Sequence, residues 1–184
     1  MTWLERLFAL TCDQLPDRSP HFAGVVFPLC YRLAGLYLGV AGSYIAVAAG
    51  RGWREPVSVR RGIALGAFLL PFLIDGWANT LHIWSTSGPI RALTGLTAGI
   101  ALPILLVSID APRVAGDVDP VRTLLWAAGA GLLLTGVLLR PGSPTAFVGI
   151  AVVAAAGFVL LLLNLLWAAR PSAWNHAVVR QDAG

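Results

Sequence analysis

Residues 62–84 read GIALGAFLLPFLIDGWANTLHIW, a run of 23 residues in which Asp75 is the one side chain charged at neutral pH. About 20 apolar residues in a helix suffice to cross the hydrocarbon layer of a bilayer, which is about 30 Å thick. Over all 184 residues, 57% are hydrophobic and 12% are charged, against about 25% charged residues in a soluble domain. Because so few charges cannot cover a water-facing surface, the sequence predicts an integral membrane protein.

Four more apolar runs flank this segment, and each is also long enough to span a bilayer. The predicted transmembrane helices are residues 28–49, 62–84, 92–109, 121–139 and 146–169. The loops between them are short, which is typical of an up-and-down helical bundle. We therefore predict an all-α, multi-pass bundle over residues 28–169, with the lipid bilayer as its main partner.

Residues 1–27 precede the first predicted span. Apolar residues recur at helical spacing over residues 2–10, which predicts a short interfacial helix, and Thr2 with Glu5 forms a candidate capping box. The prolines in the following loop exclude a continuous helix there. The N-terminus lacks the basic region and long apolar run of a cleaved signal peptide.

The distribution of arginine predicts the orientation of the bundle. Eight arginines fall in loops and tail on one side and four on the other. The eight are Arg51, Arg54, Arg60, Arg61, Arg113, Arg122, Arg170 and Arg180, and the four are Arg6, Arg18, Arg91 and Arg140. The positive-inside rule then predicts a plasma or inner membrane protein with its N-terminus outside and its tail, residues 170–184, in the cytoplasm. Arginines scattered in this way form no long basic patch, so we expect no nucleic-acid partner.

Asp75 lies near the middle of the second predicted span. On a helical wheel its face is shared by Pro71, Asn79 and His82. The opposite face carries Leu70, Leu73, Trp77, Leu81 and Trp84. This division predicts that Asp75 faces the interior of the bundle and that the tryptophans face lipid.

A carboxylate in hydrocarbon costs at least about 2.5 kcal/mol, so Asp75 should be paired, protonated or hydrated. Arg32, about one turn inside the first span, is the first candidate partner, and Arg91, at the start of the third span, is the second. A buried pair can fix helix register or form a functional site, and the sequence leaves both interpretations open. His82 is expected near the outer interface as a hydrogen-bonding residue rather than a ligand.

Cys12 and Cys30 both fall on the predicted outer side. If that side is oxidising, they can form a disulfide that closes the loop before the first span. A metal site is the alternative, with Asp13, His21 and His82 completing the ligand set, although the spacing does not require it. The preferred interpretation is that the two cysteines form a disulfide or remain free thiols, and no cofactor is predicted.

Four groups of residues stand out by their order and spacing: CDQLPDRS at 12–19, CYRLAGLYLG at 30–39, Asp75-Gly76, and Arg91 with Thr94-Gly95. They resemble a family of small prokaryotic membrane proteins known as domain of unknown function 2085, over residues 12–105. The matching positions are Cys12, Gln14, Pro16, Arg18, Ser19, Cys30, Arg32, Gly35, Tyr37, Gly39, Asp75, Gly76, Arg91, Thr94 and Gly95.

Two positions depart from the pattern of this family. Asp13 stands where the pattern has histidine, and Leu33 stands where it has a second cysteine. If the Cys/His set of the family binds a metal or performs dithiol chemistry, this chain lacks one ligand and one thiol. The resemblance implies the architecture and supplies no activity.

Small residues recur every four positions on three predicted helices: Gly35-Gly39-Ser43, Gly95-Gly99 and Ala127-Gly131-Thr135. Such spacing lets helix backbones approach closely, and with five helices we expect the contacts to lie inside the bundle. No phosphate-binding glycine loop, nucleophile elbow or zincin motif is present, which argues against a known hydrolase or nucleotide enzyme.

Three functions remain open. The preferred one is a non-catalytic subunit or scaffold that packs against other membrane-protein subunits. The first alternative is a small carrier or proton-linked accessory protein that uses Arg32 and Asp75. The second is a thiol-redox or metal-handling membrane protein that uses Cys12 and Cys30.

Overall fold

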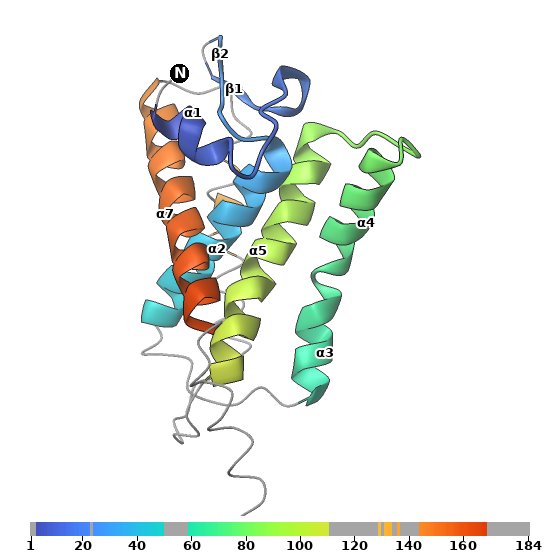
Figure 1. Cartoon of the computed structure of the whole chain (residues 1–184), viewed down its shortest axis with the longest axis vertical. Helices are drawn as coiled ribbons and strands as arrows, with labels where there is room; N and C mark the ends of the chain where they lie inside the picture. The colour runs from blue at the N-terminus through green and yellow to red at the C-terminus, as the bar shows by residue number, and fades with distance from the viewer. Residues whose placement is uncertain are drawn as a thin grey trace, which may run out of the picture.

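The computed structural model describes residues 3–22, 24–49, 59–110, 129, 131–133, 136 and 144–168. In this part of the chain, long helices lie side by side and a small cap covers one end of them (Figure 1). The cap contains α1 (Trp3–Phe8), the 3-10 turn η1 (Pro16–Arg18) and the strands β1 (His21–Phe22) and β2 (Val25–Val26). The bundle contains α2 (Tyr31–Ala49), α3 (Val59–Ala67), α4 (Leu70–Thr80), α5 (Gly88–Asp110) and α7 (Pro144–Ala168). The predicted helical class is therefore confirmed.

Four of the five predicted spans coincide with these helices, and residues 121–139 lie largely outside the described residues. Two helical stretches in the described part, Gly62–Thr80 and Gly88–Leu106, are long and apolar enough to cross a bilayer. The third predicted span begins earlier than expected, at Gly88, because Pro89 fits the first turn of a helix. The predicted number of five spans stays a prediction.

The second predicted span is divided into α3 and α4 by a turn at Phe68–Leu69. Pro71 explains the break, since its nitrogen cannot donate to the carbonyl oxygen of Ala67, four residues earlier. The helix also ends at Thr80 rather than at Trp84. The prediction of one continuous helix over residues 62–84 was therefore wrong in these two respects.

Helices α2 and α5 form the most extensive contact of the bundle. They run in parallel, with Gly35 against the backbone of Ala92, and with the Ser43 hydroxyl donating to the carbonyl oxygen of Ile100 at 3.0 Å. A Cβ on Gly35 or on Gly95 would overlap backbone atoms of the neighbouring helix. The small-residue spacing on both helices therefore serves contacts inside this bundle.

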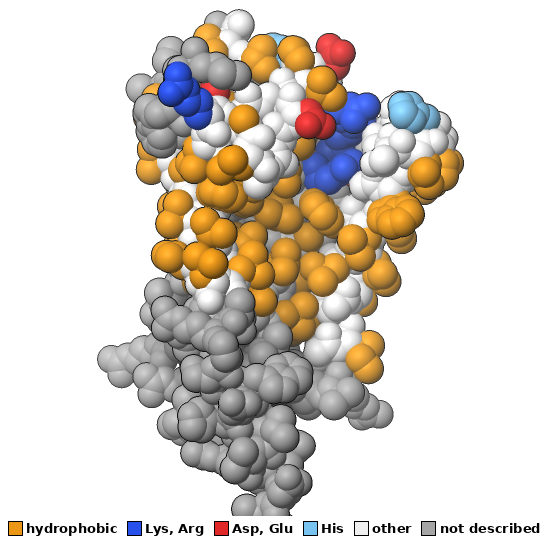
Figure 2. All heavy atoms as spheres, viewed as in Figure 1, with side chains coloured by type: hydrophobic (Ala, Val, Ile, Leu, Met, Phe, Trp, Pro, Cys, Tyr) orange, Lys and Arg blue, Asp and Glu red, His pale blue; other side chains and the backbone are white. Residues whose placement is uncertain are grey.

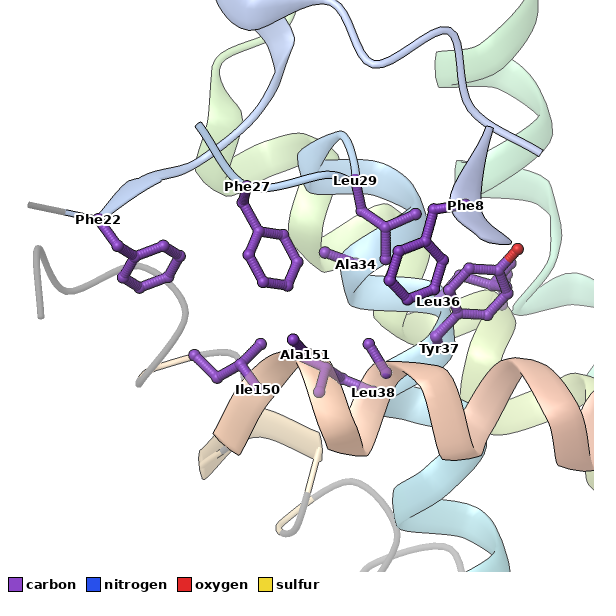
Figure 3. Close-up of a cluster of buried hydrophobic side chains, with 12 residues drawn as sticks. Phe8, Phe22, Phe27, Leu29, Ala34, Leu36, Tyr37, Leu38, Ile150 and Ala151 are labelled. Atoms are coloured by element: carbon purple, nitrogen blue, oxygen red, sulfur yellow. The ribbon is translucent and has the colours of Figure 1, made fainter. Parts of the chain in front are cut away.

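Figure 1 shows that α2, α5 and α7 begin at the capped end, whereas α3 and α4 run toward it. The start of α7 is fixed by Phe147, whose ring lies edge-on to those of Phe22 and Phe27 at centroid distances of 5.9 and 5.3 Å. The Tyr37 hydroxyl of α2 donates to the hydroxyl of Thr11 at 3.0 Å. These contacts belong to a cluster of buried side chains that joins the cap to α2 and α7 (Figure 3).

The cap is more structured than the predicted interfacial helix and loop. Strands β1 and β2 form an antiparallel hairpin in which His21 pairs with Val26 and Phe22 with Val25. Gly24 in the turn has φ +82°, a backbone conformation that residues other than glycine rarely adopt. Thr2 of the candidate capping box lies outside the described residues.

Hydrophobic side chains (orange in Figure 2) cover the middle of the visible face of the bundle, below the cap. The face of α4 that the helical wheel assigned to lipid is exposed, and Trp77 has 69% of its surface accessible. Leu70 and Leu73 on the same face are also exposed. Leu81 and Trp84, which the wheel placed with them, follow the end of α4 and are exposed as well. A surface of this kind is suited to lipid rather than to water.

Candidate functional site

At the capped end, the cap and the ends of α2, α4 and α5 surround a pocket of about 300 Å³. Three arginines, one carboxylate and both cysteines of the chain contribute to its lining: Arg18, Arg32, Arg91, Asp13, Cys12 and Cys30. Figure 2 shows basic side chains (blue) gathered between the cap and α4. Arg32, Arg91 and the two cysteines, which the sequence analysis selected on separate segments, thus lie in one region.

Asp75 is 4% exposed and lies beside this pocket in α4. The guanidinium of Arg32 contacts its Oδ2 through Nη2 at 2.6 Å and Nε at 2.8 Å. Oδ1 accepts the Thr86 hydroxyl at 2.6 Å and the Asn79 amide at 2.9 Å, and the Thr94 hydroxyl lies 3.4 Å from Oδ2. Both oxygens are therefore engaged, and an ionised carboxylate is well stabilised in this position.

Arg91 is the second candidate partner, and the structure gives it a different role. Its side chain is 7% exposed, and its Nη2 donates to Asn79 Oδ1 at 2.7 Å while Nε donates to Thr86 Oγ1 at 3.2 Å. Both acceptors are neutral. Within the described residues, Arg91 makes no ion pair, because Asp75 pairs with Arg32 instead.

The predicted polar face of the second span is only partly buried. Asp75 and Asn79 are buried, but Pro71 and His82 are exposed. His82 lies past the end of α4 with φ 56°, so the helical wheel no longer applies to it. The inclusion of His82 in a buried polar face was therefore wrong.

Thr86 was missed by the sequence analysis, although it bonds to Asp75, Asn79 and Arg91. It lies in the loop between α4 and α5, where no helical spacing relates it to Asp75. A polar run between two spans, Ser85-Thr86-Ser87, was the one available signal.

Cys12 and Cys30 are free thiols that lie together at the start of α2. The Cys12 sulfur accepts the backbone N–H of Cys30 at 3.3 Å. A hydrogen bond from the Cys30 thiol is the main cause that lowers the pKa of Cys12 to about 6. The same contact raises the pKa of Cys30, which lies before the first residue of α2. Of the two thiols, Cys12 is therefore the one that ionises more readily.

The loop after Cys12 holds that sulfur in place. Gln14 has φ 51°, and its backbone N–H also bonds to Cys12 and contributes to the lowered pKa. The Gln14 side chain donates to the carbonyl oxygen of Glu5 at 2.7 Å, and Ser19 donates to that of Leu15 at 3.0 Å. Pro16 starts η1, which carries Arg18 to the pocket.

The set of metal ligands considered from the sequence is not assembled. Among the described residues, no three of the side chains of histidine, cysteine, aspartate and glutamate lie close enough to hold one ion. His21 is in β1 and His82 is at the end of α4, so neither joins Cys12 and Cys30 in the lining of the pocket.

The glycines of the family pattern lie where helices meet around the pocket. A Cβ on Gly95 would overlap the carbonyl oxygen of Arg32, and one on Gly39 would overlap the backbone of α5. Gly76 follows Asp75, and a Cβ there would lie 3.7 Å from Nη1 of Arg32. Gly39 and Gly95 therefore allow the contact between α2 and α5 to form, whereas a Cβ at Gly76 would make an ordinary van der Waals contact.

The comparison with known families agrees with this region of the chain. A family model described as a predicted membrane protein (DUF2085) matches residues 12–105. The chain belongs to this family. The matched segment of DUF2085 contains both cysteines and the Arg32–Asp75 pair, and the predicted membrane class is confirmed.

A second comparison finds a relative that is similar to part of this chain. An uncharacterized protein of Methanothermobacter thermautotrophicus is 36% identical over 100 residues, which are 53% of this chain and 86% of the relative. No solved structure matches this DUF2085 chain.

The two departures from the DUF2085 pattern both belong to the lining of the pocket. Asp13 and Leu33 lie there beside the cysteines.

Proposed function

We propose that this DUF2085 protein is a membrane protein with a redox centre at its capped end, in which Cys12 and Cys30 cycle between a dithiol and a disulfide. The observation that carries the proposal is the direct contact of the two cysteines in the pocket, where the Cys12 sulfur lies 3.3 Å from the backbone nitrogen of Cys30. A thiolate with a lowered pKa beside a second, protonated thiol is the arrangement that thiol–disulfide exchange requires.

The chemistry needs an oxidant, which we propose to be a disulfide, RSSR. The Cys12 thiolate attacks one sulfur of RSSR, forms a mixed disulfide and releases RS⁻. The Cys30 thiol then loses its proton to a base, and its sulfur attacks the Cys12 sulfur and releases the second RS⁻. The base passes this proton to one of the two RS⁻ ions, so RSSR becomes one RS⁻ and one RSH while the protein loses two electrons.

The scaffold function is less well supported by the structure than by the sequence. Its support was the short loops, the lack of a complete catalytic set and the spacing of small residues. The small residues pack inside the bundle: Gly35 and Gly95 lie against neighbouring backbone, and Gly131 lies against Leu96. The described part of these surfaces is therefore not open to another subunit.

The carrier function relied on Asp75 as a group that binds a proton or substrate. The carboxylate of Asp75 is engaged by Arg32, Asn79 and Thr86. A carrier needs an acidic group with an oxygen free to bind its cargo, and both oxygens of this carboxylate already accept bonds from the chain. The geometry favours a structural role for Asp75.

We further propose five spans, with the cap outside the cell. Two observations support this topology: α5 ends away from the cap whereas α7 begins beside it, and α2, α5 and α7 run in one direction (Figure 1). α2 ends and α3 begins away from the cap (Figure 1), and the sequence between them carries Arg51 and Arg54. By the positive-inside rule, we propose that this end faces the cytoplasm. An outward cap would expose the cysteines to an oxidising compartment.

The test uses the full chain in neutral detergent, with glutathione disulfide as the probe and mass spectrometry as the readout. We expect the wild type to form an internal Cys12–Cys30 disulfide and to release two molecules of reduced thiol. Cys30→Ser should stop at a mixed disulfide on Cys12, and Cys12→Ser should react at least about tenfold more slowly at pH 7, because its remaining thiol is protonated. If the wild type forms no internal disulfide, or if both variants react equally fast, the proposal fails.

A further inference from the structure

The proposed dithiol function does not account for the environment of Arg91. Its guanidinium is 7% exposed, yet within the described residues it bonds only to the neutral groups of Asn79 and Thr86. A buried cation is costly unless a negative charge or several strong acceptors surround it. The neighbouring carboxylate of Asp75 is already paired with Arg32.

Two more arginines increase the positive charge around this residue. Arg18 and Arg32 line the same pocket as Arg91, and both act on Arg91 as like charges, whereas Asp75 acts on it as an opposite charge. Asp13 also lines the pocket, but its side chain is exposed to solvent. The pocket therefore combines Arg91, whose printed hydrogen bonds go to neutral groups, with the exposed Arg18. In its lining, three arginines outnumber Asp13 and the Cys12 thiol.

We propose that the pocket binds an anionic phosphate or carboxylate group, with Arg91 and Arg18 as its direct ligands. Arginine presents its N–H donors in a planar fork that matches the oxygens of carboxylate and phosphate. The volume of about 300 Å³ is at the lower limit of pockets for small molecules, so it accommodates a small organic anion or a lipid headgroup. This inference does not rest on the dithiol function, because neither arginine takes part in the exchange reaction.

Arg18 and Arg91 are the proposed ligands, whereas Arg32 supports the fold. Arg32 is fixed by Asp75 and holds α2 against α4, so its removal would disturb the fold. Arg18 lies in η1 with an exposed side chain, and no hydrogen bond from its guanidinium is recorded among the described residues. Arg18→Gln therefore removes a ligand and leaves the bundle intact. Arg6→Gln, in α1 and away from the lining, is the matched control.

The experiment measures the thermal unfolding of the full chain in neutral detergent, at pH 7.5 and constant ionic strength. Sodium phosphate, pyrophosphate or citrate replaces sodium chloride in steps. We expect at least one of these anions to raise the midpoint in a saturable manner, since ligands that bind only the native state stabilise it. Arg18→Gln should raise the concentration for half of the effect by about tenfold or more, and Arg6→Gln should not change it.

Two further measurements separate anion binding from the dithiol proposal and identify the source of the anion. The same shift in a Cys12→Ser variant shows that anion binding stands whether or not the dithiol proposal does. Stabilisation in nanodiscs of phosphatidylglycerol relative to phosphatidylcholine, weakened by Arg18→Gln, assigns the group to a lipid headgroup, whereas equal stability in both lipids assigns it to a free anion. The proposal fails if no anion stabilises the chain more than chloride, or if Arg18→Gln and Arg6→Gln behave alike.

Discussion

The carboxylate of Asp75 joins three segments that are separate in the sequence. It accepts donors from Arg32 in α2, from Thr86 in the loop after α4 and from Thr94 in α5. The carboxylate is 4% exposed, so the cost of removing its charge from water is offset only while these donors remain. At the scale of single residues, the capped end therefore depends on one acidic side chain.

Loss of either member of the ion pair should have unequal effects. Asp75→Asn leaves the Arg32 guanidinium without a counter-charge, and arginine cannot release its proton, so we expect a loss on the order of 3 kcal/mol in the free energy of unfolding. Arg32→Gln should cost less, because the carboxylate can take up a proton. The double variant should be more stable than the sum of the single changes predicts. Thermal unfolding in detergent measures all three, and equal stability of all variants with the wild type would contradict the structural role.

The reactivity of Cys12 should follow its lowered pKa of about 6. Because the thiolate is the reactive form, the rate of alkylation by iodoacetamide should rise through about pH 6 and become nearly constant above pH 7. An unperturbed thiol, with a pKa near 9.0, would still gain reactivity at pH 8. Cys30→Ala removes the main cause of the shift, so its inflection should move to higher pH. Site-resolved mass spectrometry gives both profiles, and a wild-type rate that keeps rising through pH 8 would refute the assignment.

The sequence predicted the individual site residues where helical spacing applies. Asp75 and Asn79 follow from the wheel, because they lie four residues apart within α4. Thr86 and His82 do not, because the helix ends at Thr80 and the wheel says nothing about the loop beyond it. The proximity of Cys12 to Cys30 depends on the turn at Gln14, whose left-handed conformation no pattern in the sequence signals.

The contact between α2 and α5 sets the geometry of the pocket at the scale of elements. Glycines on both helices let the backbones meet, so that Arg32 on one helix and Thr94 on the other reach the same carboxylate. The sequence predicted that these small residues make contacts inside the bundle, because small residues every four positions mark a face for close approach, but it did not predict which helices meet. It did not predict the hairpin of β1 and β2, whose strands of two residues are too short for a recognisable alternation.

A methyl group in this contact should destabilise the bundle. Gly95→Ala places its Cβ on the carbonyl oxygen of Arg32, and the neighbouring backbone cannot rotate away as a side chain could, so we expect a loss of about 1–3 kcal/mol in stability. Gly149→Ala in α7 is the control, because a Cβ there meets nothing within 4 Å and alanine favours a helix by about 1 kcal/mol over glycine. Chemical unfolding compares the two, and a neutral Gly95→Ala would show that the helices are further apart than described.

On the face that Figure 2 shows, charged side chains lie at the capped end and hydrophobic side chains cover the described helices below it. Composition alone predicted the membrane class, since 12% charged residues cannot cover a water-facing surface. The direction of the described helices adds what composition could not, because α2, α5 and α7 all lead away from the cap.

The orientation can be tested with reporters that fold or fluoresce on one side of the membrane only. Fusions at Gly184 and in the loop of residues 51–58 should both report the cytoplasm, and one beside Asp17 should report the outside. The arginine bias is the physical reason, since positively charged loops are retained in the cytoplasm. A reporter at Gly184 that is active only outside would contradict the orientation and the five spans together.

The ion pair between Arg32 and Asp75 also bears on how the chain enters the membrane during synthesis. Arg32 is the second residue of α2 and arrives near the lipid headgroups, but Asp75 lies within α4 and would meet hydrocarbon by itself. A single acidic residue in a segment weakens its partition from the translocon by about 2.5–3.5 kcal/mol. If α2 remains at the lateral exit until the next segment emerges, the two opposite charges can leave together as a helical hairpin. The first half of the chain should therefore integrate as one unit, and a ribosome stalled between the two segments should leave α2 waiting beside the translocon.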